Sequence, residues 1–393
     1  MLERGWAYQP RTDGVRSPRF TLCVQTLELT YPVPLQVAIV GCGAVAQRLY
    51  RKPLQQLEKR GVLRVASLVD PVADHAASLG RFFAGAATHR ELDEALNSSS
   101  LDLALVLSPA HLHCDHVVQA LLRDVHVLCE KPMASTADDC VRMQAAALEH
   151  KRVLAIGMIR RYFPAFAELK RIIDEGRLGT LQGFEYREGH KFEWEVTTPA
   201  AFRPRAAGGT GVLFDIGPHV IDHLAWTFGD LQVTRYADDA LAGIESNASM
   251  DVVSPACPGS IHLSWDNPQT NELRVFGAKG EAVLRIDRFD QLAVLGPSGF
   301  EPHPITVSFP ADAQPLAASM MTPRSYPQAI YCQIVQMARA IALGEAPTVD
   351  GERGRRTVEI LESALSIAEP LAMPWLDVPE QEAFARLHWR DAR

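Results

Sequence analysis

The sequence predicts an α/β protein with an N-terminal doubly wound parallel sheet and a C-terminal α+β domain built on a large, open, mostly antiparallel sheet. From Leu35 to about Ala155, short apolar runs rich in β-branched residues alternate with helical stretches, as in parallel sheets whose strands are buried on both faces. After about residue 157 the strand-like runs alternate apolar and polar residues, with turn residues between them, which favours antiparallel or mixed pairing.

The first part of the chain is predicted as one domain, residues 35–156, and the rest as a second, residues 157–393. In the first domain we expect strands at Val37–Val40, Arg64–Val69, Ala86–Thr88, Asp102–Leu107, His126–Cys129 and Val153–Ile156. Helices are expected between them at Ala44–Arg60, Ala73–Phe83, Glu91–Ser98, His111–Arg123 and Thr136–His150. Asp138 and Asp139 suit the first turn of the last of these helices, which Ser135 or Thr136 can cap.

The second domain is predicted to bind substrate and to form oligomers. Its strands are expected at Leu181–Glu188, Leu231–Asp238, Ala248–Val253, Gly259–Trp265, Glu272–Gly277, Glu281–Asp287 and Asp290–Leu295. Its helices are expected at Pro164–Glu175, Thr210–Phe228, Pro327–Ala342 and Gly354–Ala368.

A glycine-rich turn follows the first strand, where residues 37–46 read VAIVGCGAVA. Gly41 allows a tight turn, Gly43 lets a pyrophosphate approach the backbone, and Ala46 lets the next helix lie close to the strand. This strand–turn–helix context predicts a Rossmann-type dinucleotide site. The residues expected there are Gly41, Cys42, Gly43, Ala44, Val45 and Ala46, with Cys42 filling a steric role.

Asp70 ends the second expected strand, about 27 residues after Gly43, near the position of the acid that binds the adenosine ribose. Its carboxylate accepts bonds from ribose hydroxyls and repels a 2′-phosphate. The sequence therefore favours NAD over NADP. The structural alternative is a plain glycine turn with Asp70 as a helix cap.

Composition argues against several classes of partner. A net charge of −8 and a pI near 5.9 do not suit nucleic acid or an anionic membrane as the main partner. No apolar run reaches the roughly 18 residues that span a bilayer. The seven cysteines lack C-x-x-C spacing, which predicts reduced thiols and a cytoplasmic location. His111, His113 and His116 with Cys114 do not match a structural zinc pattern, so no metal is expected.

Residues 1–34 are predicted as an N-terminal extension. They combine scattered arginines with prolines and lack an apolar core of signal-peptide length. Two interpretations stay open: a loosely packed or disordered extension, or an arm that lies on a neighbouring subunit through Trp6, Tyr8 and Phe20.

Further motifs occur in a fixed order along the chain. They are Ser108-Pro109-x-x-x-His113, Glu130-Lys131-Pro132, the run Gly157–Tyr162, the run GGTGVLFDIGPH at 208–219, and Asp350-Gly351-Glu352-Arg353. With the glycine turn, this set resembles the glucose-fructose oxidoreductase/inositol dehydrogenase (Gfo/Idh/MocA) family over about residues 35–370. The resemblance implies NAD(P)-dependent enzymes acting mostly on sugars, cyclitols and their derivatives.

The resemblance also implies roles for individual residues. Ser108, Pro109, His113, Glu130 and Lys131 would lie at the cofactor. Lys131, Asp215 and His219 would be catalytic, and these three with Arg161 would contact substrate. For Arg161, which matches the family arginine, the alternative is a structural role. The chain departs from the family at Ile159, where a polar residue, often Asn, is usual. This departure weakens any inference of a side-chain hydrogen bond from that loop.

The chemistry expected of Lys131 follows from its place after the fifth strand, at the carboxyl edge where ligands bind in doubly wound folds. An ammonium there stabilises the alkoxide that develops as an alcohol is oxidised. A lysine with a lowered pKa can instead take part in proton transfer. The alternative is a surface lysine in a Glu-Lys pair.

Asp215 and His219 are four residues apart, which places them on one face of a continuous helix. Pro218 lies between them, so a kink or a restart of the helix is expected. An imidazole serves as acid or base near neutral pH, and a carboxylate can orient it or bind a substrate hydroxyl. The structural alternative is a capping Asp and a core His. Asp222 and His223 are expected at the surface or behind the site.

The expected function is transfer of a hydride between nicotinamide and a CH–OH carbon of a sugar, cyclitol or derivative, in a homodimer or homotetramer formed through the C-terminal sheet. Two alternatives remain: a redox-neutral enzyme that uses NAD transiently for elimination or glycoside cleavage, and a non-catalytic NAD-responsive regulator. Arg203 and Arg205 are either solvated loop charges or contacts for an acidic substrate. Substrate specificity is expected near Lys191, Glu193, Trp194 and Glu195.

Overall fold

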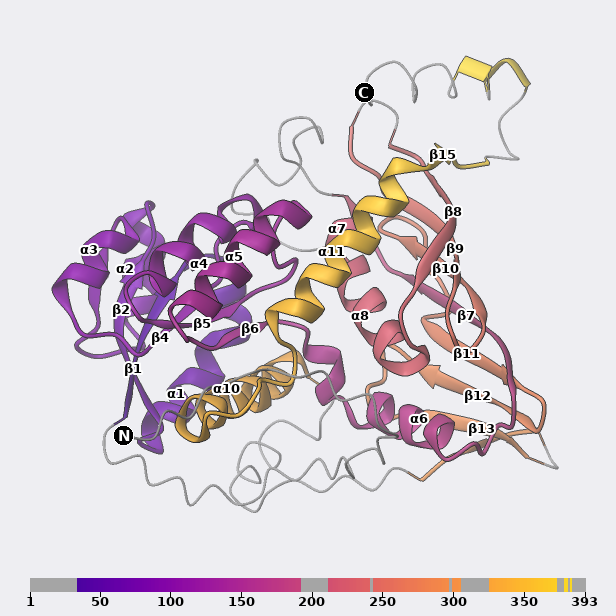
Figure 1. Ribbon diagram of the computed structural model, residues 1–393, viewed down its shortest axis with the longest axis horizontal. Helices are drawn as coiled ribbons and strands as arrows, with labels where there is room; N and C mark the ends of the chain where they lie inside the picture. The colour runs from indigo at the N-terminus through magenta and orange to yellow at the C-terminus, as the bar shows by residue number, and fades with distance from the viewer. Residues whose placement is uncertain are drawn as a thin grey trace, which may run out of the picture.

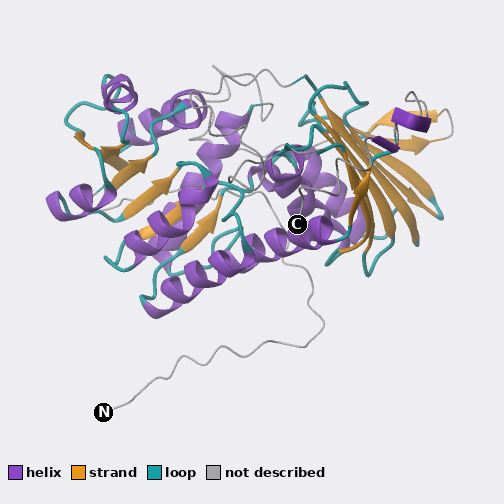
Figure 2. Ribbon diagram, turned by 90° about the horizontal axis from the view of Figure 1, so that it is seen from above, coloured by secondary structure: helices purple, strands orange, loops and turns teal. Residues whose placement is uncertain are grey.

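Two sheets of different construction organise the chain (Figures 1 and 2). The computed structural model describes residues 34–191, 211–240, 243–296, 299–304, 325–372, 378–380 and 382–383. A parallel six-stranded sheet forms the N-terminal domain, and a mixed nine-stranded sheet forms the C-terminal domain. The predicted fold class is confirmed. The predicted extension 1–34 lies outside the described residues except for Pro34.

The first sheet has the strand order β3-β2-β1-β4-β5-β6, and all its pairs are parallel. Its strands are β1 (Leu35–Val40), β2 (Leu63–Val69), β3 (Ala87–His89), β4 (Leu103–Val106), β5 (His126–Cys129) and β6 (Leu154–Ile156). The order reverses between β1 and β4. This is the switch point at which doubly wound folds bind ligands, beyond the carboxyl ends of the strands.

Helices cover both faces of this sheet, as expected from its near-continuous apolar strands. They are η1 (Ala46–Tyr50), α1 (Arg51–Lys59), α2 (Ala73–Gly80), α3 (Leu92–Ser98), η2 (Ala110–Leu112), α4 (His113–Leu121) and α5 (Ala137–Glu149). The Thr136 side chain caps α5 by accepting from the Asp139 amide at 3.2 Å, as one of the two predicted caps.

The expected single helix Ala44–Arg60 contains a widened turn. The five residues of η1 are π-helical, and the Arg51 amide donates to the Ala46 carbonyl five residues earlier. Pro53 follows in the first turn of α1. Its ring would clash with the carbonyl of Leu49 in a regular helix, and it has no N–H to donate. A wider turn immediately before Pro53 relieves that conflict.

The second sheet has the order β14-β13-β12-β11-β7-β10-β9-β8-β15. Its strands are β7 (Leu181–Gly189), β8 (Gln232–Asp238), β9 (Asn247–Val253), β10 (Pro258–Ser264), β11 (Glu272–Gly277), β12 (Gly280–Arg285), β13 (Leu292–Gly296), β14 (Gly299–Pro302) and β15 (Ala368–Pro370). Two pairs, β7 with β10 and β8 with β15, are parallel, and the others are antiparallel.

Helices cover one face of the second sheet, as Figure 2 shows. They are η3 (Ile159–Tyr162), α6 (Pro164–Asp174), α7 (Val212–Asp215) and α8 (Gly217–Phe228). Phe184 of β7 stacks on Phe228 of α8 with ring centroids 4.6 Å apart, and this contact fixes α8 on the sheet. The predicted interruption before Pro218 is observed, because α7 ends at Asp215 and α8 restarts at Gly217.

The last two long helices contact both domains. Helix α10 (Tyr326–Leu343) packs on η1, α1 and η3, and α11 (Gly351–Ser366) packs on α5 of the first domain and α8 of the second. Figure 1 shows α11 running between the two sheets. The two domains are therefore connected by the chain's late helices as well as by its central segment.

Within the described residues, no helix is both long and apolar enough to cross a membrane.

Candidate active site

The glycine-rich turn lies at the switch point of the first sheet. Gly41 has φ +94°, and a Cβ there would meet the Leu107 carbonyl carbon and the Ser108 nitrogen at 2.7 Å. The turn after β1 therefore packs directly against the chain leaving β4. Only glycine satisfies both the positive φ and the missing volume. Cys42 is fully buried beside it, and its steric role stays a prediction.

The Asp70 carboxylate faces this turn from the end of β2. Its Oδ2 accepts from the Cys42 amide at 2.8 Å, and its Oδ1 accepts from the Val72 amide at 2.9 Å. His75 Nδ1 lies 3.3 Å from Oδ1. Asp70 thus anchors the glycine turn by its side chain, a structural role that the sequence spacing did not reveal. Its role at the ribose stays a prediction.

Two histidines hold the loop that follows β4. His113 is almost fully buried, with Nε2 2.7 Å from the Ser108 carbonyl and Nδ1 2.8 Å from the Pro132 carbonyl. His116 Nδ1 lies 2.9 Å from the Ser108 hydroxyl. Burial lowers the pKa of both imidazoles. Both ring nitrogens of His113 thus lie within hydrogen-bond distance of main-chain oxygens from two loops at the predicted cofactor edge, and the single N–H of the neutral ring donates to one of them.

Glu130 and Lys131 leave β5 in different directions. Glu130 points inward, where Oε1 accepts from the Tyr50 hydroxyl at 2.7 Å and Oε2 accepts from the Lys131 amide at 2.9 Å. Burial raises the pKa of Glu130. Lys131 extends toward the second domain, and the Lys131–Pro132 peptide bond is cis.

Lys131 and Asp215 form an ion pair across the two domains. Lys131 Nζ donates to Asp215 Oδ1 at 2.8 Å and to the Asp215 carbonyl at 2.7 Å. Trp265, directly after β10, donates its indole N–H to Asp215 Oδ2 at 3.3 Å. Partial burial acts to raise the pKa of Asp215, but Lys131 and Trp265 outweigh it and the pKa lies below its ordinary value. The carboxylate stays ionised and holds the ammonium in place.

His219 lies one helical turn beyond Asp215, near the start of α8. Burial, reinforced by the charges of Lys131 and Arg160, holds the pKa of His219 well below its ordinary value of 6.5. Its Nδ1 is buried and has no hydrogen-bond partner among the described residues. The structure thus pairs the predicted ammonium and carboxylate, and the charge of Lys131 reaches the neutral imidazole of His219.

The two arginines of η3 point into separate buried networks. Arg161 makes a bidentate pair with Asp222, through Nε at 2.9 Å and Nη2 at 2.6 Å. Arg160 donates to Glu188 at 2.7 Å and also contacts the Tyr186 hydroxyl. The guanidinium of Arg161 is thus engaged by Asp222, and its predicted contact with substrate stays a prediction.

Asp222 and His223 are both buried, so of the two expected positions the one at the surface is wrong, and the position behind the site stays a prediction. His223 is fully buried, packs on the Phe166 ring at 4.5 Å between centroids, and leaves both ring nitrogens without a partner in the described chain. Burial, with Arg160 and Arg161, holds the pKa of His223 well below 6.5.

His223 is therefore neutral in the folded protein, whereas its side chain can bind a proton in the unfolded chain at a higher pH. Below pH 6.5 the unfolded state binds a proton that the folded state rejects, so stability falls as pH falls. The slope is about 1.4 kcal/mol per pH unit for each such histidine. We expect chemical denaturation between pH 7 and 5 to show this loss, and His223→Leu to show a shallower slope. An unchanged slope in His223→Leu would contradict the assignment.

Several residues singled out from the sequence lie outside the described residues: Gly208, Gly209, Thr210, Arg203, Arg205, Glu193, Trp194 and Glu195. Lys191 is described and is exposed. The described ranges hold no group of three or more His, Cys, Asp or Glu side chains arranged to bind a metal ion.

Sequence reasoning missed the partners that hold the site. Tyr50 and Trp265 belong to no motif, although Trp265 ends an expected strand at the domain junction. Glu245 was also missed: its Oε1 accepts from the Leu213 amide at 3.0 Å, and a Cβ on Gly211 would lie 2.3 Å from its carboxyl carbon. Gly211 in the glycine run is therefore required by a buried carboxylate that lies 34 positions later in the chain.

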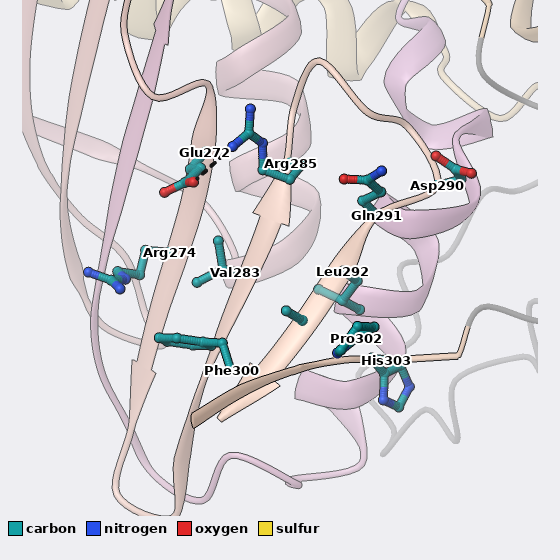
Figure 3. A pocket seen from close by; sticks show the side chains of 11 residues that line it. Glu272, Arg274, Val283, Arg285, Asp290, Gln291, Leu292, Phe300, Pro302 and His303 are labelled. Atoms are coloured by element: carbon teal, nitrogen blue, oxygen red, sulfur yellow. Dashed lines mark hydrogen bonds and ion pairs between the residues drawn. The ribbon is translucent and has the colours of Figure 1, made fainter. Parts of the chain in front are cut away.

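A separate hollow lies on the face of the second sheet opposite α6 and α8 (Figure 3). It has a volume of about 530 Å³ and is lined by strands β11–β14. Arg285 pairs there with Glu272, and Arg274 lies over the Phe300 ring. None of the residues of the Lys131 site lines it.

The chain belongs to the Gfo/Idh/MocA family of oxidoreductases. Residues 35–158 match the family described as "Oxidoreductase family, NAD-binding Rossmann fold", and residues 166–283 match the "GFO/IDH/MocA C-terminal domain". The resemblance expected from the motifs is confirmed, and the N-terminal domain is an NAD(P)-binding Rossmann domain.

Among curated relatives, the chain is 27% identical over 195 residues to scyllo-inositol 2-dehydrogenase (NADP(+)) IolW of Bacillus subtilis, a match covering 50% of this chain and 52% of that protein. It is 29% identical over 197 residues to inositol 2-dehydrogenase 3 of Saccharopolyspora erythraea, covering 50% and 54%. The matches thus span about half the length of these relatives.

The fold is shared with levoglucosan dehydrogenase in complex with NADH and levoglucosan. The TM-score is 0.73 at 18% sequence identity, over 85% of this chain and 96% of that one. The WlbA dehydrogenase of Bordetella pertussis, in complex with NADH and UDP-GlcNAcA, gives a TM-score of 0.70 at 19% identity, over 85% and 95%.

Proposed function

We propose that this chain is an NAD-dependent oxidoreductase that transfers a hydride between nicotinamide and a CH–OH or C=O carbon of a sugar, cyclitol or sugar derivative. One observation carries the proposal: Lys131 of the dinucleotide domain meets Asp215 of the second domain at 2.8 Å, with the neutral His219 one turn away. The proposed catalytic groups thus come from both domains, beside the carboxyl edge of the sheet, where a dinucleotide would end.

The residues present fit a dinucleotide. The turn Gly41–Gly43 opens toward the helix that follows it, Asp70 stands at the end of β2, and the Ser108 loop forms the other wall of the switch point. The nicotinamide, when bound, supplies the hydride acceptor or donor. We favour NAD, because the Asp70 carboxylate would repel a 2′-phosphate, and we expect a lower KM for NAD than for NADP.

Lys131 is suited to polarise the substrate oxygen. Two of its three ammonium hydrogens are directed to Asp215. Among the described residues the third has no partner, so it can be donated to an oxygen at the reacting carbon. Positive charge placed beforehand at a developing alkoxide stabilises the transition state. Asp215 holds the ammonium in this direction through its carboxylate and its carbonyl oxygen. His219, which is neutral, can take the hydroxyl proton during oxidation or return it during reduction.

The pH profile tests the role of His219. Because the pKa of His219 lies well below 6.5, the imidazole remains a competent base below that pH. We expect kcat/KM for oxidation to stay level from pH 8 down through 6.5 and to fall only at lower pH, since kcat/KM reports groups of the free enzyme. Half-loss at pH 6.5 or above would contradict this assignment. His219→Gln should remove that acid limb together with most of the activity.

A turnover screen tests the proposed function itself. Purified protein is assayed with NAD and NADP against inositols, hexoses, uronates and nucleotide-linked sugars, with absorbance of NADH as the readout. Net NADH accumulation with a polyol supports the proposal. Product formation without net NADH identifies the redox-neutral alternative, and NADH binding without any turnover identifies the regulator.

We propose that this chain forms a homodimer or a homotetramer through the C-terminal sheet, in the cytoplasm. Support comes from the broad face of the second sheet that α6 and α8 leave uncovered (Figure 2). Paired charges lie on this face, including Arg187 with Glu185 and Arg285 with Glu272. Light scattering after size exclusion should give a dimer or tetramer mass, and a monomer at micromolar concentration would refute it.

A further inference from the structure

A buried chain of hydrogen bonds joins the helix after the glycine-rich turn to the backbone of Lys131. The Tyr50 hydroxyl donates to Glu130 Oε1, and Glu130 Oε2 accepts from the Lys131 amide, at 2.7 and 2.9 Å. Neither the pairing of Lys131 with Asp215 nor its proposed action on the substrate oxygen requires Tyr50. The hydrogen bonds from Tyr50 through Glu130 to Lys131 therefore indicate a separate role.

The Glu130 side chain has little freedom to move. Tyr50 is fully buried on one side of it. On the other side, a Cβ on Gly157 would lie 3.0 Å from Glu130 Oε2 and 3.1 Å from its Cα. Each carboxylate oxygen has one fixed donor, and both donors favour the ionised form against the effect of burial. The carboxylate thus acts as a rigid spacer between Tyr50 and the Lys131 backbone.

Tyr50 also has a defined relation to the predicted phosphate site. It is the last residue of η1, whose first residue, Ala46, belongs to the glycine motif. The widened turn of η1 therefore separates the end of that motif from the Tyr50 phenol. Such π turns recur at functional sites, and here the turn ends on a residue bonded to the loop of the proposed catalytic lysine.

We propose that Tyr50 is a positioning residue that acts through Glu130 to fix the Lys131 loop against the helix expected to hold the cofactor phosphates. Ordering of that helix by a dinucleotide is thereby coupled to placement of the Lys131 ammonium. The effect of this coupling on catalysis rests on the proposed function. The coupling between the helix and the position of Lys131 can be tested without it.

The coupling is measured by the reactivity of Lys131 toward an amine-acylating reagent. The extent of labelling at Lys131 is followed by peptide mass spectrometry, with and without NADH. In wild-type protein we expect slow labelling, because Asp215 holds the ammonium, and further slowing by NADH. In Tyr50→Phe the ring remains but the hydroxyl is lost. We expect labelling about threefold faster or more and weaker protection by NADH, with kcat about tenfold lower.

Tyr331→Phe is the matched control. Tyr331, on α10, is also a buried tyrosine with a hydrogen-bonded hydroxyl. That hydroxyl accepts from the Arg60 guanidinium at 2.7 Å. Its loss should leave Lys131 labelling unchanged. Equal labelling in wild type and Tyr50→Phe would overturn the proposal. So would faster labelling in both variants, because general loosening would then explain the effect.

Glu130→Gln separates geometry from charge. A glutamine can accept from the Lys131 amide and donate to the Tyr50 oxygen, so we expect labelling close to that of wild type. Labelling as fast as in Tyr50→Phe would show that charge holds the loop and would overturn the proposal. If Tyr50→Phe does not fold, as judged by thermal melting, Glu130→Ala decides the question because it removes the acceptor of both hydrogen bonds: labelling of Lys131 about threefold faster supports the coupling, and labelling equal to wild type overturns it.

The labelling assay needs no substrate. If the turnover screen finds no polyol activity, the proposed function fails while the coupling is still measured. If turnover is found and labelling is the same in every variant, the coupling alone fails.

Discussion

Replacing Lys131 by methionine should lower turnover at least about 10²-fold, the scale of a positioned acid–base or electrostatic group. The flexible apolar side chain keeps most of the volume and loses the ammonium that contacts Asp215 at 2.8 Å. Since the ammonium is proposed to act on the reacting oxygen of the substrate, we expect the loss mainly in kcat, with NADH affinity changed less than about threefold.

Stability should change little in this variant. The Asp215 side chain is 41% exposed, so water can replace the lost partner, and we expect a loss below about 1 kcal/mol. Thermal melting separates this outcome from unfolding. Lys170→Met is the control, because Lys170 pairs with Asp174 at 2.8 Å on the surface of α6, and it should behave as wild type. Near-normal turnover in Lys131→Met would remove Lys131 from the mechanism.

The second large effect is expected from Gly41→Ala. The new methyl group would meet the Leu107–Ser108 backbone at 2.7 Å, and the residue would keep a φ of +94°. Backbone atoms cannot move away as the end of a flexible side chain can. The steric overlap therefore adds to the strain of the positive φ. We expect the free energy of unfolding to fall by about 2–4 kcal/mol. NADH affinity should fall by about tenfold or more, because the turn shapes the pyrophosphate site.

Gly61→Ala provides the comparison. Gly61 has a similar φ of +71°, but nothing lies within 4 Å of the position that the new methyl group would take. We therefore expect only the left-handed penalty of about 1 kcal/mol and unchanged NADH affinity by fluorescence titration. If the two variants bound NADH equally well, the close approach at Gly41 would not shape the site.

The fold was largely predictable because local patterns determine it. Alternating apolar strands and helices give the parallel sheet, and the glycine turn marks its switch point. Pro218 also indicated the break between α7 and α8, because the effect of proline on a helix is local. The π turn was not predicted, although Pro53 is its local signal.

The site was predictable only where motifs mark it. Lys131, Asp215 and His219 come from distant motifs, and the structure brings them together. What holds them was not predictable: Trp265 reaches Asp215, and Tyr50 reaches Glu130, across 50 and 80 positions. Such pairings depend on tertiary packing and leave no periodic signal. Whether His223 is buried or exposed stayed open for the same reason, because a histidine on a helix does not reveal what packs against it.

The attachment of the chain's last third to the edge strand β6 has a consequence for dissection of the molecule. The Ile156 amide donates to the Val349 carbonyl at 3.0 Å, and Ala155 forms a bridge with Asp350. Gly354 lies so close that a methyl group there would touch Ile156 at 2.7 Å. A polypeptide cut after residue 158 would bare this strand's unpaired amides and carbonyls beside apolar surface, a known template for aggregation. Insolubility of such a fragment would therefore reflect loss of the segment that pairs with β6. Nucleotide affinity is properly measured on the intact chain.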